Sequence, residues 1–399
     1  MLIATWLRFA IAATTVVAST TTFAQSPNSR NVARNLVQSG MVRTGDKVLV
    51  SGSVRDAALL EDIAIEVMKL GAHPLIIIGS DRLTRRSFDE VPAKYDDVTS
   101  PIGRMLVDNF DVQIALDVGE AEGLPADVPV ARLTARAKAN EPVNQAFFKR
   151  GVRFVNLGNG LYPTASVARR LGVPQSAVSG VFWKAAGVPA STLRANAEAL
   201  RRAVAAGKVV TVTAPNGTNL SFRVDNDRAI ISDGALTPEK VKQGAAAAQT
   251  WLPAGEFIAP ADNGSANGKV VFDRYVWNGQ LLRGLTLTFK DGELQSMTAA
   301  NDMSRLKAQY DAAGGAKSRF GYIDIGVNPE TRLPVGTGRV VWTAPGSVVL
   351  GFGDNRGFGG SNASDFGLAA QLANATVRVD GTTIVQNGSI RREFRSAAR

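Results

Sequence analysis

The sequence predicts an α/β domain followed by a β-rich α+β domain, and three observations carry this prediction. In the N-terminal half, short apolar runs alternate with amphipathic stretches, which is typical of parallel βαβ units. After residue 208, closely spaced strand-like runs and tight turns take over. Finally, 399 residues with 45% hydrophobic and 20% charged side chains are enough for about two domains with ordinary cores.

The first βαβ unit is the clearest. Residues 47–52 and 74–78 are two predicted strands, and 57–70 between them form a helix with Leu60, Ile63 and Val67 on one face. Gly71 is expected to end that helix. A short helix is predicted over 31–40, and further strands over 111–116 and 152–157.

The second half is predicted from its turns. Asn216-Gly217 separates two strand-like runs, 209–214 and 220–224, as in a tight hairpin. Further strands are predicted over 269–272, 285–289, 340–342 and 347–352, and one clear helix over 302–313. The expected organisation is a signal peptide over 1–24, an α/β domain over 28–190, a helical linker over 191–207 and a β-rich domain over 208–399.

The N-terminus has the features of a secretory signal. Arg8 supplies a positive charge, residues 9–19 are mainly apolar, and Thr22-Phe23-Ala24 places small residues before a possible cleavage at Gln25. The apolar part is shorter than the roughly 20 residues of a comfortable span, although an uncleaved anchor is the alternative. We therefore expect a periplasmic or secreted protein.

Composition excludes several kinds of site. The chain has no cysteine, so disulfides, thiol catalysis and cysteine-ligated metals are excluded. Its one histidine, His73, precedes a proline at a predicted strand start, so a Ser-His-Asp triad is not expected. The net charge of +10 comes from scattered Lys and Arg residues, which suits an anionic envelope better than nucleic acid.

A series of phrases in the second half has a recognisable order. These phrases include 215–220 (PNGTNL), 252–257 (LPAGEF), 268–273 (GKVVFD), 287–292 (LTFKDG), 319–321 (RFG), 351–353 (GFG) and 359–364 (GGSNAS). Together they resemble the aminopeptidase T family of metallopeptidases, and the N-terminal α/β domain fits that family more loosely. The resemblance implies the family's two-domain fold, hydrolysis of peptides, and a homodimer that encloses the active-site cavity.

The resemblance also implies two divalent metals, usually zinc or cobalt, held by two glutamates, two histidines, a tyrosine and an aspartate. Glu256 matches the first glutamate, but Tyr322 stands at the second. The other four positions fall near Val349, Arg356, Gly367 and Ala369. Glu256 is thus the only retained metal-ligand position, and the sequence argues against tightly bound zinc.

The candidate site is therefore a rebuilt one. Glu256, Tyr322 and Arg356 are the predicted catalytic residues: Glu256 to bind a cation or an amine, Tyr322 to donate to a carbonyl, and Arg356 to clamp a carboxylate beside Glu256. Asp354, Asp365 and Asn362 are predicted to bind substrate. The two aspartates could instead form an all-oxygen cation site with Glu256, or only bond to the local backbone.

Three functions remain open. The first is an exported hydrolase of peptides or related amides with a site that lacks histidine. The second is a non-catalytic periplasmic binding protein for a small acidic or peptide ligand. The third is an iron-dependent dioxygenase like the dihydroxypyridine dioxygenases that resemble the same fold, but two histidines and a carboxylate are needed there.

Overall fold

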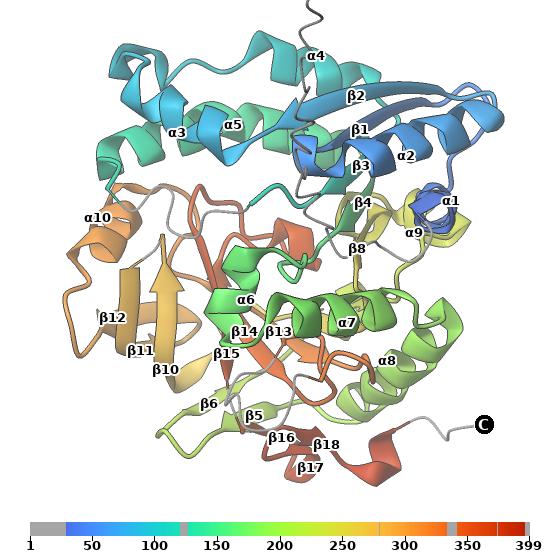
Figure 1. The fold of residues 1–399 in the computed structure, drawn as a ribbon. Helices are drawn as coiled ribbons and strands as arrows, with labels where there is room; N and C mark the ends of the chain where they lie inside the picture. The colour runs from blue at the N-terminus through green and yellow to red at the C-terminus, as the bar shows by residue number, and fades with distance from the viewer. Residues whose placement is uncertain (1–28, 120–126, 279, 333–340, 373, 396–399) are drawn as a thin grey trace, which may run out of the picture.

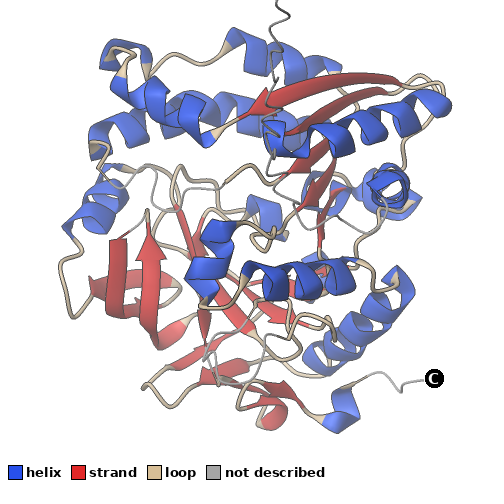
Figure 2. Cartoon of the chain, viewed as in Figure 1, coloured by secondary structure: helices blue, strands red, loops and turns tan. Residues whose placement is uncertain are grey.

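The computed structural model describes residues 29–119, 127–278, 280–332, 341–372 and 374–395, and the elements are drawn in Figures 1 and 2. The predicted signal peptide lies outside these ranges. Within them, no helix is long and apolar enough to cross a bilayer.

The N-terminal half is built on a parallel sheet, as predicted. Its order is β2-β1-β3-β4-β8, and every neighbouring pair runs parallel. The strands are β1 (Lys47–Ser53), β2 (His73–Gly79), β3 (Val112–Leu116), β4 (Arg153–Leu157) and β8 (Gln249–Leu252). The first four agree closely with the runs predicted from apolar patterning.

Helices cover this sheet on both faces (Figure 2). They are α1 (Ser29–Ser39), α2 (Ala57–Lys69), α3 (Asp81–Asp89), α4 (Pro101–Asn109), α5 (Val130–Arg150), α6 (Ala165–Leu171) and α7 (Gln175–Ala186). The predicted stripe of α2 is buried against the sheet, with Leu60, Ile63 and Val67 at most 1% exposed. Gly71 follows α2 with a φ of 72°, a conformation that glycine adopts without strain.

The C-terminal half contains two antiparallel sheets that share one core. The larger has the order β12-β11-β10-β6-β5-β16-β17-β18, and the smaller has the order β15-β14-β13-β9-β7. Phe222 from the first sheet and Phe257 and Phe320 from the second meet in this core. The helix α8 (Ala190–Ala205) packs on it through Ala197, Leu200 and Val204, so the predicted linker is part of this core.

The remaining strands belong to the two antiparallel sheets. The larger sheet comprises β5 (Val210–Thr213), β6 (Asn219–Phe222), β10 (Asn267–Trp277), β11 (Gln280–Lys290), β12 (Glu293–Thr298), β16 (Thr376–Val379), β17 (Thr382–Gln386) and β18 (Ser389–Ile390). The smaller comprises β7 (Ile230–Ser232), β9 (Glu256–Pro260), β13 (Phe320–Gly326), β14 (Val348–Gly353) and β15 (Gly367–Leu372). The C-terminal half also contains the helices α9 (Pro238–Gln243) and α10 (Ser304–Ala312).

Two features differ from the prediction. β8 lies within the predicted C-terminal domain but pairs with β4, so the chain returns to the first sheet. Leu252 ends β8, and Glu256 begins β9 four residues later. In addition, the strand predicted over 340–342 differs at its described residues: residue 340 lies outside the described ranges, and Val341 and Trp342 lie in irregular and turn structure before β14. Their apolar side chains fill space between the domains: Val341 joins the first core and Trp342 packs beside Tyr322's cluster.

Candidate functional site

Glu256 and Asp324 meet on one face of the smaller sheet. In the antiparallel register of β9 and β13, Ile258 pairs with Asp324 and Glu256 pairs with Gly326. Side chains two residues apart point the same way, so Glu256 and Asp324 are diagonal neighbours. The opposite face of β13 carries Ile323 and Ile325 into the core. The sheet therefore presents two acids on its inner surface toward the N-terminal domain.

Both acids are withdrawn from water. Glu256 is 5% exposed and Asp324 is 6% exposed, and the Oδ1 atom of Asp324 has no hydrogen-bond partner among the described residues. Burial raises the pKa of Glu256 to about 7, while the neighbouring polar side chains of Ser232 and Asn159 act in the opposite direction. Burial, and then the charge of Glu256, raise the pKa of Asp324 well above its usual range. The pair therefore retains at least one proton near neutral pH.

Asp324 was missed by the sequence analysis, which placed the second acid position at Tyr322. A signal for it existed. An aspartate in the middle of the otherwise uncharged run FGYIDIG, two residues after Tyr322, must share that residue's face if the run is a strand. The acid beside Glu256 thus lies two residues further along the strand than the position expected from the sequence.

Tyr322 fills the space beside the acid pair. It is 3% exposed and stacks on Phe358 with ring centroids 4.1 Å apart and an interplanar angle of 18°. Opposite it, a Cβ atom at Gly351 would lie only 2.2 Å from the tyrosine ring, so glycine makes room for that ring. Burial, and next the nearby Asp324 and Glu256, raise the pKa of the phenol, which keeps its proton.

Asn159 brings the N-terminal domain to Glu256. It follows β4 with a φ of 45°, between Gly158 and Gly160, which also have positive φ. Its backbone N–H donates to Asn156 Oδ1 at 2.8 Å, and its Nδ2 donates to the Pro253 carbonyl at 2.9 Å. This turn fixes the side chain at the end of β4, where it lowers the pKa of Glu256. This residue was not among those predicted from the sequence.

The ion pairs of Arg356 are formed with Glu141 and Asp354 rather than with Glu256. Its Nη1 donates to Glu141 of α5 at 2.7 Å, and its Nε and Nη2 donate to Asp354 at 2.8 and 2.7 Å. The guanidinium also lies 5.7 Å from the ring centroid of Phe148. These carboxylates, Asp354 first, raise its pKa above the ordinary arginine value. Arg356 and Asp354 thus join the loop after β14 to the N-terminal domain.

The other two predicted ligand-binding residues make local contacts. Asp365 accepts a hydrogen bond from the Gly314 backbone at 2.5 Å. Asn362 is 1% exposed, and its backbone N–H donates to Asn355 at 2.8 Å. The carboxamide oxygen of Asn362 has no partner among the described residues. Their roles in binding a substrate stay predictions, and the structure gives each a place in the loop framework.

A polar pocket lies beyond the tyrosine, at the carboxyl end of β9. Its volume is about 340 Å³, and its lining includes Arg223, Arg228, Asp262, Asn355 and Ser361. Pro260, which also lines it, pairs with Tyr322 across the sheet. Arg228 donates to the Gly360 carbonyl at 2.9 Å. The pocket is therefore bordered by the same loop that carries Phe358.

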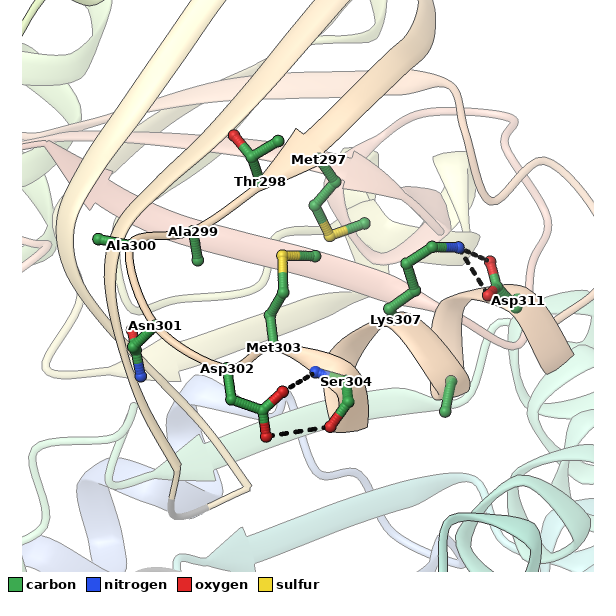
Figure 3. A pocket seen from close by; sticks show the side chains of 11 residues that line it. Met297, Thr298, Ala299, Ala300, Asn301, Asp302, Met303, Ser304, Lys307 and Asp311 are labelled. Atoms are coloured by element: carbon green, nitrogen blue, oxygen red, sulfur yellow. Dashed lines mark hydrogen bonds and ion pairs between the residues drawn. The ribbon is translucent and has the colours of Figure 1, made fainter.

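A broader groove lies between the end of β12 and α10 (Figure 3). Met297 and Met303 face it, and the Lys307–Asp311 ion pair, 2.7 Å long, stands on its rim. Its volume is about 810 Å³. The predicted site residues are not among those that line it. His73 is also remote from Glu256, since it begins β2 at the opposite edge of the parallel sheet from β8.

The parallel sheet, the two antiparallel sheets and the acid-bearing strand β9 define a protein with an α/β half and a β-rich half. The family model of the thermophilic metalloproteases (M29) matches residues 26–328, and the chain belongs to that family. The match includes Glu256, Tyr322 and Asp324 and ends before the loops that carry Arg356 and Asn362.

Two solved structures share the fold. Wild-type AmpT from Thermus thermophilus has 14% sequence identity and a TM-score of 0.64, over 91% of this chain and 98% of that one. The 2,5-dihydroxypyridine dioxygenase from Pseudomonas putida KT2440 has 12% identity and a TM-score of 0.58, over 94% and 100%. No curated protein matches the chain. At these identities the likeness establishes the fold.

A metal centre does not fit the residues on this face. Among the residues that the structure describes, no group of three or more His, Cys, Asp or Glu side chains could hold a metal ion. Opposite Asp324 stands Val349, and opposite Tyr322 stands Gly351. Zinc sites of hydrolytic enzymes use three protein ligands, and Glu256 and Asp324 supply two. The family's name and the donor set of this chain thus disagree.

Proposed function

We propose that this chain is an exported hydrolase of peptides or related amides whose site works through the Glu256–Asp324 acid pair. Membership of a peptidase family supports the substrate class. The observation that carries the mechanism is the shared burial of two adjacent acids, with the pKa of Glu256 raised to about 7. Such a pair holds one carboxylate and one carboxylic acid at the same time, which is the arrangement needed for general acid–base catalysis.

The chemistry follows from that division. The ionised acid removes a proton from water as the water oxygen attacks the amide carbon. The protonated acid gives its proton to the carbonyl oxygen, which receives the electron pair of the broken π bond. The C–N bond then breaks as the nitrogen takes a proton from the acid that first removed one. At the same time a hydroxyl of the intermediate returns its proton to the other acid, which leaves a carboxylic acid and an amine and restores the acid pair. Tyr322, with its proton retained, would donate a hydrogen bond to the carbonyl oxygen.

The test is hydrolysis of aminopeptide and other amide substrates by the purified mature chain, with and without chelator and with added zinc, cobalt or manganese. We expect turnover that chelator leaves unchanged. Glu256→Gln and Asp324→Asn should each lower kcat by a factor of about 100 or more. The matched control is Asp97→Asn, at an exposed aspartate. Stoichiometric bound metal, with activity abolished by chelator, would contradict the proposed mechanism.

A second candidate is a non-catalytic binding protein for a small acidic or peptide ligand. The observation that favours it is the Tyr322–Phe358 stack, which occupies the face beside the acids, together with the separate pocket that offers Arg223 and Arg228. Absence of turnover on every substrate class, combined with a rise in melting temperature on adding acidic peptides, would favour this function. Arg228→Ala should then abolish the rise.

Export is the part of the proposal that rests on the N-terminal sequence alone. Arg8, the apolar residues 9–19 and the small residues around Ala24 support cleavage before Gln25. The expected result is a periplasmic or secreted form whose intact mass corresponds to a chain beginning at Gln25. A full-length chain in the membrane fraction would indicate an uncleaved anchor instead.

A further inference from the structure

Exposed apolar side chains are concentrated in one part of the molecule. Of fifteen large hydrophobic residues that are exposed among the described ones, thirteen lie between Val54 and Met105. The two exceptions, Val209 and Val276, are single residues in the C-terminal half. Scattered exposed hydrophobics are ordinary, whereas a concentration of this kind marks an interaction surface.

The centre of this surface is the edge strand β2. Within the described part of the chain β2 pairs only with β1, so one side of its backbone has no strand partner. Its sequence HPLIIIG contains no Lys, Arg, Asp or Glu, and its pairing with β1 is regular over all seven residues. Leu75, Ile77 and Ile78 are 44%, 37% and 50% exposed. Edge strands are normally protected by charges, prolines, bulges or a covering element, and of these β2 has only Pro74, near its start, among the described residues.

The helix α2 extends the apolar surface on one face of the sheet. Its contact with α1 lies on the flank of Asp62, where Ser29 donates to the carboxylate at 2.5 Å. Met68 is six residues further along and projects about 240° away, from the opposite flank. Met68 and its neighbour Ile65 are 51% and 48% exposed. In Figure 1, α2 lies along the front of β1 and β2.

We propose that β2 is a self-association edge, on which β2 of a second copy pairs antiparallel across a twofold axis to form a continuous ten-stranded parallel-and-antiparallel sheet. In such a pairing apolar side chains from 74–78 meet apolar side chains from the same segment. A partner with a charged strand would bury unpaired charge there, whereas a second copy brings none.

Charge and area also favour a second copy. Ionic side chains around the surface are already paired within the chain: Lys69 with Glu66 at 2.7 Å, Arg86 with Glu90 at 2.6 Å and Arg104 with Asp108 at 2.8 Å. The rim is thus nearly neutral, which disfavours an anionic surface or nucleic acid as the occupant. The half-exposed side chains of β2 and α2, together with the unpaired backbone of β2, would be covered in such a pairing, as in the apolar centre of a stable interface of roughly 800 Å² per partner.

This interface is separate from the acid pair. β2 and β8 are the two opposite edges of the parallel sheet, and Glu256 follows β8. Pairing through β2 therefore leaves the face of Glu256 and Asp324 unaffected, unlike the cavity-enclosing dimer that family resemblance implies. The proposal does not depend on the proposed hydrolysis.

The first test is the molar mass of the mature chain by light scattering and sedimentation at about 50 μM. We expect Ile77→Lys to halve the mass of the assembly, since it would place two ammonium groups in an apolar pairing. The control is Val276→Lys, a substitution at a valine of similar exposure, 40%, on β10, which should leave the mass unchanged. A monomeric wild type, or an Ile77→Lys protein that is folded and has the wild-type mass, would overturn the proposal.

The second test uses the absence of cysteine from the chain. Single cysteine variants at Leu75, Ile76, Ile77 and Ile78 place one thiol along the edge, and only positions near the twofold axis bring two thiols within disulfide distance. We expect mild oxidation to link at least one of these variants into a covalent dimer within minutes, with Val276→Cys remaining monomeric on a denaturing gel. Equal cross-linking at Val276, or none along β2, contradicts the antiparallel pairing.

Discussion

Two buried aspartates, one in each half of the molecule, have opposite surroundings. Asp96, in the N-terminal half, receives hydrogen bonds from Arg132 Nε at 2.5 Å and from Arg136 Nε at 2.7 Å. These bonds, that of Arg132 first, lower its pKa. Asp324, in the C-terminal half, has a carboxylate neighbour, and its pKa is raised. Both side chains are little exposed, at 5% and 6%, but Asp96 has two arginine donors, whereas burial and then the charge of Glu256 keep Asp324 protonated.

The difference distinguishes a structural ion pair, at Asp96, from a pair of buried acids, at Asp324, that holds a proton available for transfer. Asp96 is matched by two guanidinium groups, and its charge connects α5 to the segment before α4. Glu256 and Asp324 store a proton in a place where loss of that proton is unfavourable for the fold. A sheet built only for stability gains nothing from two adjacent buried acids, which is the physical reason for placing function there.

The largest expected effect comes from removing a partner of Asp96. Arg132→Leu leaves the buried aspartate with one arginine and deprives the Phe88 and Val91 carbonyls of a donor. We expect a clear fall in the free energy of unfolding at pH 7, measured by urea denaturation. The control is Arg86→Leu, which breaks an exposed pair with Glu90 and should have a much smaller effect. Equal losses in the two variants would show that burial adds nothing to the Asp96 pair.

Removing a charge from the acid pair should have the opposite sign. The folded pKa of Glu256, about 7, lies above the ordinary value of 4.5. The stability associated with its proton is therefore complete below pH 4.5 and is lost as pH rises through 7. Glu256→Gln should raise the free energy of unfolding at pH 8 by up to about 3 kcal/mol, with little change at pH 4. Asp324→Asn should act in the same direction.

The measurement is urea denaturation of wild type and variant between pH 4 and pH 8.5. A variant that loses stability equally at both ends of this range would mean that a cation partners the pair. Gained stability at pH 8 combined with lost hydrolysis would show that the acids are kept for chemistry at the expense of the fold.

Much of the fold could be predicted because local patterns determine it. The strands β1 to β4 are apolar runs bounded by turns, and α2 has an apolar stripe. A few residues of local sequence are therefore enough to predict each of these elements. β8 does not: four residues, QTWL, join a sheet whose other strands precede them by about 90 residues or more, and only tertiary contacts select that partner. Val341 and Trp342 fit a strand prediction because they are apolar, but their side chains pack between the domains instead.

The site was predictable only in part, for a similar reason. Glu256 was identified by its surrounding phrase, and Tyr322 by its position in another. The pairing of Glu256 with Asp324 depends on the register of β9 and β13, strands about 60 residues apart, and that register is not written in either strand alone. The ion pair between Arg356 and Glu141 joins the two domains, and local sequence patterns do not predict it either.

A smaller effect should follow from disturbing the tyrosine that stands beside the pair. Gly351→Ala would bring a methyl group to within 2.2 Å of the Tyr322 ring and force it off the Phe358 stack. We expect a loss of about 2 kcal/mol, measured by urea denaturation, from overpacking. Gly180→Ala in α7, where no atom lies within 4 Å, should instead stabilise by about 0.5–1 kcal/mol. A stable Gly351→Ala protein would mean that the ring moves freely, which would open the face to substrate.

The smallest effect concerns Asn159, a residue of the N-terminal domain that acts on the pKa of Glu256. Its side chain lowers that pKa, so Asn159→Gly should move the pH midpoint of the Glu256-dependent stability upward by less than about one unit. Glycine keeps the positive φ accessible, and Asn374→Gly, at an exposed asparagine with a φ of 55°, controls for backbone freedom. A midpoint that moves equally in both variants would assign the effect to the backbone. A shift confined to Asn159 would show that the parallel sheet, through the turn after β4, sets the proton affinity of an acid in the neighbouring domain.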